Sequence, residues 1–225
     1  MPIAIDHAFR DPDLLRQALT HRSFGTPHNE RLEFVGDAVL NCVIALALYR
    51  RFPDIPEGDL SRVRAHLVNR ETLARLARAL GLGASMRLGE GEQRSGGADR
   101  ASILADALEA VFGAVVVDAG FAAAEGVING VFGDLLRDAD PRTLGKDPKT
   151  RLQEWLQSQR LPVPEYAIVA TTGEAHAQQF AVECRIPSMS IVTAGSGSSR
   201  RTAEQDAAER ALAEVTRAAP AARRG

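Results

Sequence analysis

Two stretches decide the expected fold: Asn29-Glu-Arg-Leu-Glu-Phe-Val-Gly-Asp-Ala-Val-Leu40 and Ser102-Ile-Leu-Ala-Asp-Ala-Leu-Glu-Ala-Val-Phe112. Both are rich in apolar residues, and each predicts a helix buried in a helical domain. The first stretch continues as a nearly apolar helix to about residue 51, where Pro53 and Pro56 break it. Helices flank both stretches, so the first 137 residues are expected to be all-α. One of these helices is expected over 62–80, and residues 89–99, which are glycine-rich and polar, are expected to form a loop.

The same two stretches carry four acids. Glu33 and Asp37 are spaced i, i+4, and Asp106 and Glu109 are spaced i, i+3, so each pair shares one helix face. A carboxylate among apolar residues is costly to bury unless something pairs with it. No lysine or arginine lies three or four residues from Asp37, Asp106 or Glu109. The expected partner is a divalent cation, since hard oxygen ligands suit Mg2+ or Mn2+.

A second interpretation stays open from spacing alone. Acids in the first turn of a helix stabilise its dipole, and Asn29 is a good N-cap residue. That interpretation accounts for Glu30 and also covers Glu33. It does not account for the three acids that are expected to lie further inside their helices.

Composition narrows the class of protein. The chain has 225 residues, of which 45% are hydrophobic, as expected for a globular fold. No uninterrupted apolar run of about 18 residues appears, and no secretory signal is visible, so we expect a cytoplasmic protein without a membrane span. Cys42 and Cys184 are expected to be buried free thiols, and no zinc-type cluster of cysteine and histidine is present.

Charge is unevenly distributed but uninformative by itself. Residues 1–145 carry 16 Lys+Arg and 20 Asp+Glu, and residues 146–225 carry 11 and 9. The second part is therefore only mildly basic, and its charge alone does not announce a nucleic-acid-binding domain.

The pattern changes after residue 137. A polar linker is expected over 138–147, long enough to let two domains reorient. A helix from Pro148, an alternating strand over 180–186 with two neighbouring strands, and a final helix over about 200–217 predict a small α+β domain, α-β-β-β-α, over 148–217. Residues 218–225 are expected to form a disordered tail.

Several segments together resemble one family. The two acidic stretches are similar to the signature motifs of the ribonuclease III family, and the C-terminal part resembles a double-stranded-RNA-binding domain. The matching segments are 29–40, 57–61 (Glu-Gly-Asp-Leu-Ser), 102–110, 146–155 (Lys-Asp-Pro-Lys-Thr-Arg-Leu-Gln-Glu-Trp), 173–176 (Gly-Glu-Ala-His) and 195–203 (Gly-Ser-Gly-Ser-Ser-Arg-Arg-Thr-Ala). The resemblance covers nearly the whole chain.

The resemblance implies a homodimeric endoribonuclease that hydrolyses both strands of duplex RNA. It implies 5′-phosphate and 3′-hydroxyl ends with short 3′ overhangs, a role in processing ribosomal and other structured precursor RNAs, and Mg2+ as the cofactor, with Mn2+ as a substitute. The metal ligands would be Glu33, Asp37, Asp106 and Glu109, with Asp37 and Glu109 in catalytic roles. Two cations can clamp the attacking and leaving oxygens of a phosphodiester.

The resemblance also suggests residues that contact substrate. The set is Glu30 and Glu57 in the first domain, and Thr150, Gln153, Glu154, His176, Ser198, Ser199, Arg200 and Arg201 in the second. Such binding domains recognise the minor groove and phosphates of A-form RNA. Thr202, Glu204, Asp206 and Asp99 depart from the more basic residues common in the family, so a modest RNA affinity is expected.

Two other functions are considered. One is a duplex-RNA-binding scaffold with a decayed nuclease domain, against which the presence of all four acids argues. The other is a helical metal enzyme acting on small phosphorylated compounds, against which the C-terminal domain argues. No small-molecule cofactor is expected.

Overall fold

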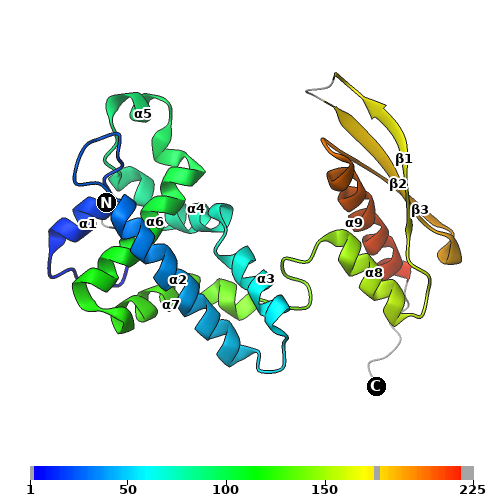
Figure 1. Ribbon diagram of the computed structural model, residues 1–225, viewed down its shortest axis with the longest axis horizontal. Coiled ribbons are helices and arrows are strands. Elements are labelled where there is room, and N and C mark those ends of the chain that lie inside the picture. The colour runs from blue at the N-terminus through cyan, green and yellow to red at the C-terminus, as the bar shows by residue number, and fades with distance from the viewer. Residues whose placement is uncertain (1–2, 175–177, 219–225) are drawn as a thin grey trace. The chain divides into compact units, whose positions relative to one another are not determined.

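The computed structural model describes residues 3–174 and 178–218. The chain divides into two compact units, one ending at Gly145 and one beginning at Lys146 (Figure 1). His176 and residues 219–225 of the tail expected over 218–225 lie outside the described residues, while Ala218 is the last residue of the final helix. The first unit is helical and the second is a three-stranded sheet with two helices, which confirms the expected fold class.

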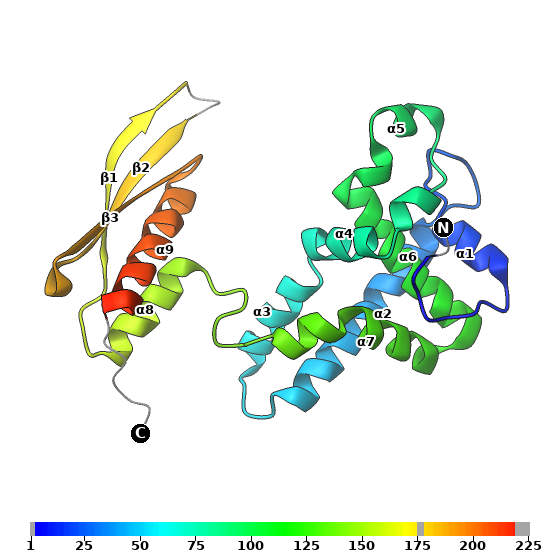
Figure 2. The same cartoon turned by 180° about the vertical axis from the view of Figure 1, so that it is seen from behind.

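The first unit is built from helices joined by short loops. Its longer helices are α1 (Pro12–Ala18), α2 (Glu30–Arg51), α3 (Glu57–Leu67), α4 (Arg70–Ala79), α6 (Ala101–Ala119) and α7 (Phe121–Asp138). A short α5 (Glu90–Arg94) and two 3-10 turns, η1 (Leu82–Ser85) and η2 (Gly97–Asp99), complete it. Helix α6 is buried along most of its length and lies against α1, α2, α4 and α7 (Figure 2).

Two glycines allow α2 and α6 to cross with their backbones in contact. A Cβ atom on Gly36 would lie 1.7 Å from the carbonyl oxygen of Glu109, and one on Gly113 would lie 2.0 Å from the carbonyl oxygen of Leu32. Real Cβ atoms do not approach so closely, so any larger residue would push the helices apart. The crossing brings the acidic segment of α2 next to that of α6.

One predicted helix is divided in two. The sequence pattern indicated a single helix from Arg62 to Leu80, whereas α3 ends at Leu67 and α4 begins at Arg70. Asn69 adopts an extended conformation between them, and its side-chain oxygen accepts a hydrogen bond from the Thr72 backbone nitrogen at 2.9 Å. This cap starts a new helix in a new direction. The loop expected over 89–99 likewise contains α5.

The first half of the expected linker packs on the helical unit. Ala139 and Pro141 are buried. The Arg62 side chain donates hydrogen bonds to the carbonyl oxygen of Pro141 at 2.8 Å and to that of Leu144. Residues 139–145 therefore belong to the first compact unit, which leaves a shorter connection than the pattern suggested.

The second unit has the expected order α-β-β-β-α. Helix α8 (Pro148–Ser158) precedes the strands β1 (Glu165–Thr172), β2 (Gln179–Ile186) and β3 (Ile191–Gly197), and α9 (Arg200–Ala218) follows them, with a 3-10 turn η3 (Pro187–Met189) between β2 and β3. The strands form an antiparallel sheet in the order β1-β2-β3. Both helices pack on one face of it, where the core residues are Leu152, Leu156, Cys184, Ile186, Ala207, Ala208, Ala211 and Val215.

An exposed apolar stripe runs along α2. Phe34 is 79% exposed and Tyr49 is 71% exposed, and Ala38 and Cys42 between them are also exposed. The expectation that Cys42 is buried was therefore wrong, because α2 buries only the face that meets α6 and its neighbours. Cys184 is buried, and both cysteines are free thiols, as expected.

Helix α2 is also the one helix among the described residues that is long and apolar enough to cross a membrane. The search of the sequence for an uninterrupted apolar run did not single out this helix. Its tight crossing with α6 buries one face of α2 in the first unit.

Candidate metal centre

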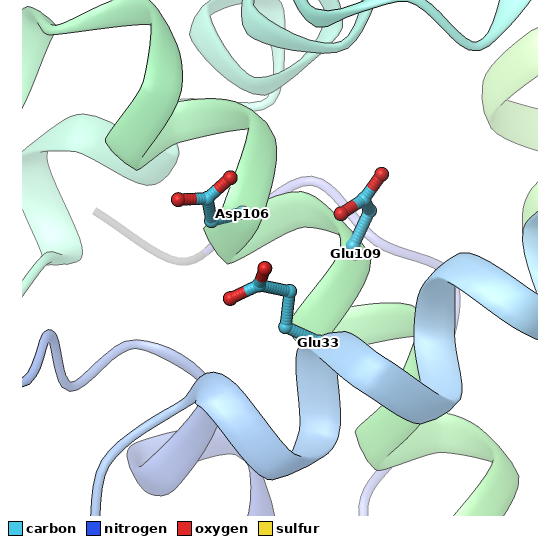
Figure 3. A group of neighbouring side chains, drawn as sticks. All are labelled: Glu33, Asp106 and Glu109. Carbon is cyan, nitrogen blue, oxygen red and sulfur yellow. The ribbon is translucent and has the colours of Figure 1, made fainter.

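Three carboxylates from two helices meet where α2 crosses α6. Glu33 of α2 and Asp106 and Glu109 of α6 each offer a carboxylate oxygen, and these oxygens lie within 4.8 Å of one another (Figure 3). All three residues are partly buried. We call these three residues the acidic cluster. The glycine-mediated approach of the two backbones is what places them together.

In the part of the chain that the structure describes, no lysine, arginine or histidine forms an ion pair with the acidic cluster. Among the described residues, none forms an ion pair or a side-chain hydrogen bond with Glu33, Asp106 or Glu109. Burial raises the pKa of Glu33, and the charge of Asp106 raises it further. Burial, followed by the charges of Asp37, Glu33 and Asp106, raises the pKa of Glu109 to about 8. Concentrated negative charge without a partner is the feature that defines the site.

Asp106 has more positive charge around it than the other two members of the acidic cluster. Burial raises its pKa, while the positive charges of Arg70, His21 and Arg22 lower it in part. None of these three residues forms an ion pair or a hydrogen bond with the Asp106 carboxylate, so their effect on it is purely electrostatic. Asp106 therefore lies where the acidic cluster meets positively charged surface.

Asp37, the fourth predicted ligand, lies beside the cluster and is not one of its members. Its side chain is exposed, and one of its carboxylate oxygens accepts a hydrogen bond from the Asn41 amide at 2.9 Å. Among the neighbouring charges, that of Asp37 contributes most to the raised pKa of Glu109. The structure thus brings three of the four acids within ligand distance of one another, with Asp37 at their edge.

The acidic cluster suits a divalent cation. Its donors are hard carboxylate oxygens, the type that Mg2+ and Mn2+ prefer. A bound cation would relieve the repulsion that raises the pKa of Glu33 and Glu109. Stabilisation of the helix dipole, the second interpretation of these acids, does not account for the cluster. It applies to the first turn of a helix, whereas Asp106 and Glu109 lie in the second and third turns of α6. Asn29 precedes α2 but makes no side-chain capping hydrogen bond.

Glu30 and Glu57, the two acids of the first unit that were expected to contact substrate, each have a partner within the chain. Glu30, in the first turn of α2, lies 3.4 Å from the Arg22 guanidinium and 3.8 Å from the His28 imidazole. It lines a pocket of about 630 Å3 that also includes Glu33 and Asp106. Glu57, in the first turn of α3, accepts a hydrogen bond from the Ser61 hydroxyl at 2.6 Å.

The described candidates for RNA contact in the second unit lie along the first two turns of α8 and at the start of α9. On α8, Gln153 and Glu154 are exposed, and Glu154 is paired with Lys146 at 2.6 Å. The Thr150 hydroxyl donates to Asp147, which starts this helix. The remaining described candidates, Ser198, Ser199, Arg200 and Arg201, are exposed at the start of α9.

Sequence reasoning missed the two cationic partners of Glu204. The residue was expected only to make the second unit less basic than its family, and it is 7% exposed. One carboxylate oxygen accepts from Lys149 at 2.5 Å and the other from Arg200 at 2.8 Å. Burial raises the pKa of Glu204, yet these hydrogen bonds outweigh it and leave the pKa lowered. The signal was the spacing of Arg200 and Glu204, one helical turn apart.

Comparison with known proteins identifies both units. Residues 11–135 match the ribonuclease-III-like family, and residues 148–215 match the double-stranded RNA binding motif. The chain is 60% identical to Ribonuclease 3 of Dechloromonas aromatica over 94% of this chain and 95% of that protein. It is also 60% identical to Ribonuclease 3 of Thiobacillus denitrificans, over 95% of each chain.

A solved structure resembles the first unit. The nuclease domain of ribonuclease III from Campylobacter jejuni is 43% identical, with a TM-score of 0.56, over 57% of this chain and 90% of that domain. That domain is described as flexible in a region involved in dimer formation.

Proposed function

Because the chain belongs to the ribonuclease III family, we propose that it cleaves both strands of double-stranded RNA at the acidic cluster with two divalent cations. The products would carry 5′-phosphate and 3′-hydroxyl ends with short 3′ overhangs. The proposed substrates are structured precursors of ribosomal and messenger RNA in the cytoplasm. The observation that carries this proposal is a set of three carboxylates within 4.8 Å of one another, with no cationic partner among the residues that the structure describes.

The acids of the first unit would bind the cations, and the second unit would bind the RNA. Glu33, Asp106 and Glu109, with Asp37 beside them, would hold Mg2+, with Mn2+ as a substitute. When bound, the cations supply an activated water and stabilise the charge on the transferring phosphoryl group. Glu109 is the most strongly perturbed acid of the cluster, and we assign it and Asp37 the catalytic roles. The second unit would hold the duplex through the exposed residues of α8 and those at the start of α9.

The test is cleavage of a hairpin RNA with mapping of both new ends. The purified full chain should cut with Mg2+, should cut with Mn2+, and should stop when EDTA is added. RNA retention in a gel shift without any cation-dependent cleavage would instead support a binding scaffold. Competition by small phosphorylated compounds, but not by duplex RNA, would support the third candidate function.

A variant pair assigns the chemistry to the cluster. Glu109→Gln should reduce cleavage at least 100-fold while leaving RNA retention with Mg2+ within about twofold, because its charge is needed at the reacting phosphate. Glu125→Gln is the matched control, since Glu125 pairs with Arg50 on the surface of α7. Full cleavage by Glu109→Gln would refute the assignment.

We also propose that the exposed stripe on α2 joins two copies of the chain. Phe34 and Tyr49 expose large apolar surfaces on one helix face, and a C2 dimer would bury them against the same face of a second copy. Two sites related by that axis could cut the two strands of one duplex. Phe34→Ser combined with Tyr49→Ser should yield monomers in sedimentation, whereas Phe121→Ser, on α7, should not.

A further inference from the structure

The pocket beside the acidic cluster is lined by positively charged side chains as well as by acids. Its volume is about 630 Å3, and its lining includes the arginines Arg22 and Arg100 as well as Glu33 and Asp106. Arg22 lies in the loop between α1 and α2, and Arg100 immediately precedes α6. Cations from two separate segments thus border the two carboxylates.

The two arginines differ in how they are held. Arg100 is committed within the protein, because it pairs with Glu92 at 2.5 Å and donates to the Ser95 hydroxyl at 3.1 Å. Among the described residues the Arg22 side chain forms one ion pair, at 3.4 Å to Glu30, and it is 72% exposed. That distance exceeds the usual range of an N–H···O hydrogen bond. The guanidinium of Arg22 therefore keeps donors available for an incoming group.

The loop that carries Arg22 is firmly anchored. The backbone nitrogen of His21 donates to the carbonyl oxygen of Arg87 at 3.0 Å, and the hydroxyl of Ser23 accepts from the backbone nitrogen of Gly89 at 3.0 Å. A Cβ atom on Gly89 would lie 2.3 Å from the carbonyl oxygen of Ser23. Arg22 thus extends from a fixed backbone between two anchored neighbours, which reduces the entropy lost when it binds a ligand.

The position of Arg22 indicates what it binds. Its charge lowers the pKa of both Glu33 and Asp106 to some extent, so it lies within electrostatic reach of the cluster. Arg22 forms no hydrogen bond or ion pair with either carboxylate. An anion bound to Arg22 therefore does not compete directly with a cation bound to the acidic cluster. An RNA strand whose reacting phosphate lies at the cluster would bring its neighbouring phosphates along the same surface. Arginine matches a phosphate with its forked donors.

We propose that Arg22 binds a backbone phosphate of the cut strand, next to the phosphate at the acidic cluster. The pocket would then position the strand, with Arg100 supporting its wall. This inference rests on the proposed function, because it requires duplex RNA as the substrate. It adds a binding residue that lies outside both acidic stretches and outside the second unit.

The first experiment measures RNA binding in the Glu109→Gln background with Mg2+ at several salt concentrations. Adding Arg22→Gln should raise Kd about tenfold and reduce the slope of log Kd against log salt by about one, as expected for one lost phosphate contact. Arg94→Gln is the matched control, because Arg94 is 80% exposed, pairs with Glu90 and does not line the pocket. It should change Kd less than twofold.

The second experiment locates the phosphate. Hairpins in which single phosphates are replaced by neutral methylphosphonates should show one position, adjacent to the cleavage site, where the Arg22-containing protein loses about tenfold in affinity. Arg22→Gln should show no further loss at that position, which is the signature of a direct pair in a double-mutant cycle.

These outcomes separate the two proposals. Equal Kd values and slopes for Arg22→Gln and Arg94→Gln, with normal cleavage by the unmodified chain, would overturn the role of Arg22 alone. An unmodified chain that fails to cut duplex RNA with Mg2+ would overturn the proposed function. Circular dichroism should show that Arg22→Gln is folded, since the side chain is mostly exposed.

Discussion

Acids lie at helix–helix contacts in both units, but they have opposite surroundings. At the crossing of α2 and α6, the charged groups that act on Glu109 are acids, and together with burial they raise its pKa to about 8. At the contact between α8 and α9, Glu204 is also buried, yet Lys149 and Arg200 bind both of its oxygens and its pKa is lowered. Burial alone therefore does not set the direction of the pKa shift of an acid: its charged neighbours do.

The largest expected effect comes from forcing the first contact apart. Gly36→Ala places a Cβ atom on the carbonyl oxygen of Glu109, so we expect a loss of about 3 kcal/mol or more in unfolding free energy and loss of RNA cleavage. Gly126→Ala is the control, because that helical glycine of α7 has open space around its Cβ position. It should change stability by less than about 1 kcal/mol. Denaturant unfolding and a cleavage assay measure both; a stable, active Gly36→Ala would contradict the account of the crossing.

The second prediction concerns matched charge removal at the two contacts. Glu204→Gln should destabilise the second unit by about 2 kcal/mol, because Lys149 and Arg200 lose a shared charged partner. Trp155, the sole tryptophan of the chain, lies in α8 and reports this unit by fluorescence. Glu109→Gln should instead raise the melting temperature of the helical unit in EDTA at pH 8, since it removes repulsion. If Glu204→Gln and Glu109→Gln both stabilised or both destabilised their units, the contrast between the two helix contacts would be contradicted.

The third prediction turns the raised pKa of Glu109 into a pH dependence. The folded state holds the Glu109 proton up to about pH 8, whereas the ordinary pKa is 4.5. Between these values the folded state binds more protons than the unfolded state, so stability falls as pH rises through this window. In EDTA the melting temperature of the helical unit should therefore fall between pH 5 and 8. Glu109→Gln should flatten that slope, and a slope that persists unchanged would assign it to other groups.

The smallest effect compares the two free thiols. Cys184 is buried, and burial raises the pKa of its thiol, so it should resist alkylation until the second unit unfolds. Cys42 is exposed on the stripe of α2, so a dimer through that stripe should shield it. The Phe34→Ser, Tyr49→Ser variant should then expose one thiol that reacts at least tenfold faster than in the unmodified chain. Equal rates would place the dimer contact elsewhere.

Much of the fold followed from local patterns. Alternation in β2 and the helical spacing of apolar residues in α9 predicted the order of the second unit, because these periods reflect burial of one face. The division between α3 and α4 was missed, since the helical pattern runs through Asn69 and a single cap outweighed it. The burial of Cys42 was misjudged because an apolar helix does not reveal which of its faces stays open.

For the candidate site, the sequence alone determined which acids lack a cation within one helical turn, and it placed Glu33, Asp106 and Glu109 among the proposed ligands. Only the tertiary structure decided that these three meet while Asp37 stays at the edge, that Glu204 has two cationic partners, and that Arg22 borders the cluster. The physical reason is that charge partners come from residues distant in the chain. A backbone contact between Gly36 and Glu109 sets which of them meet.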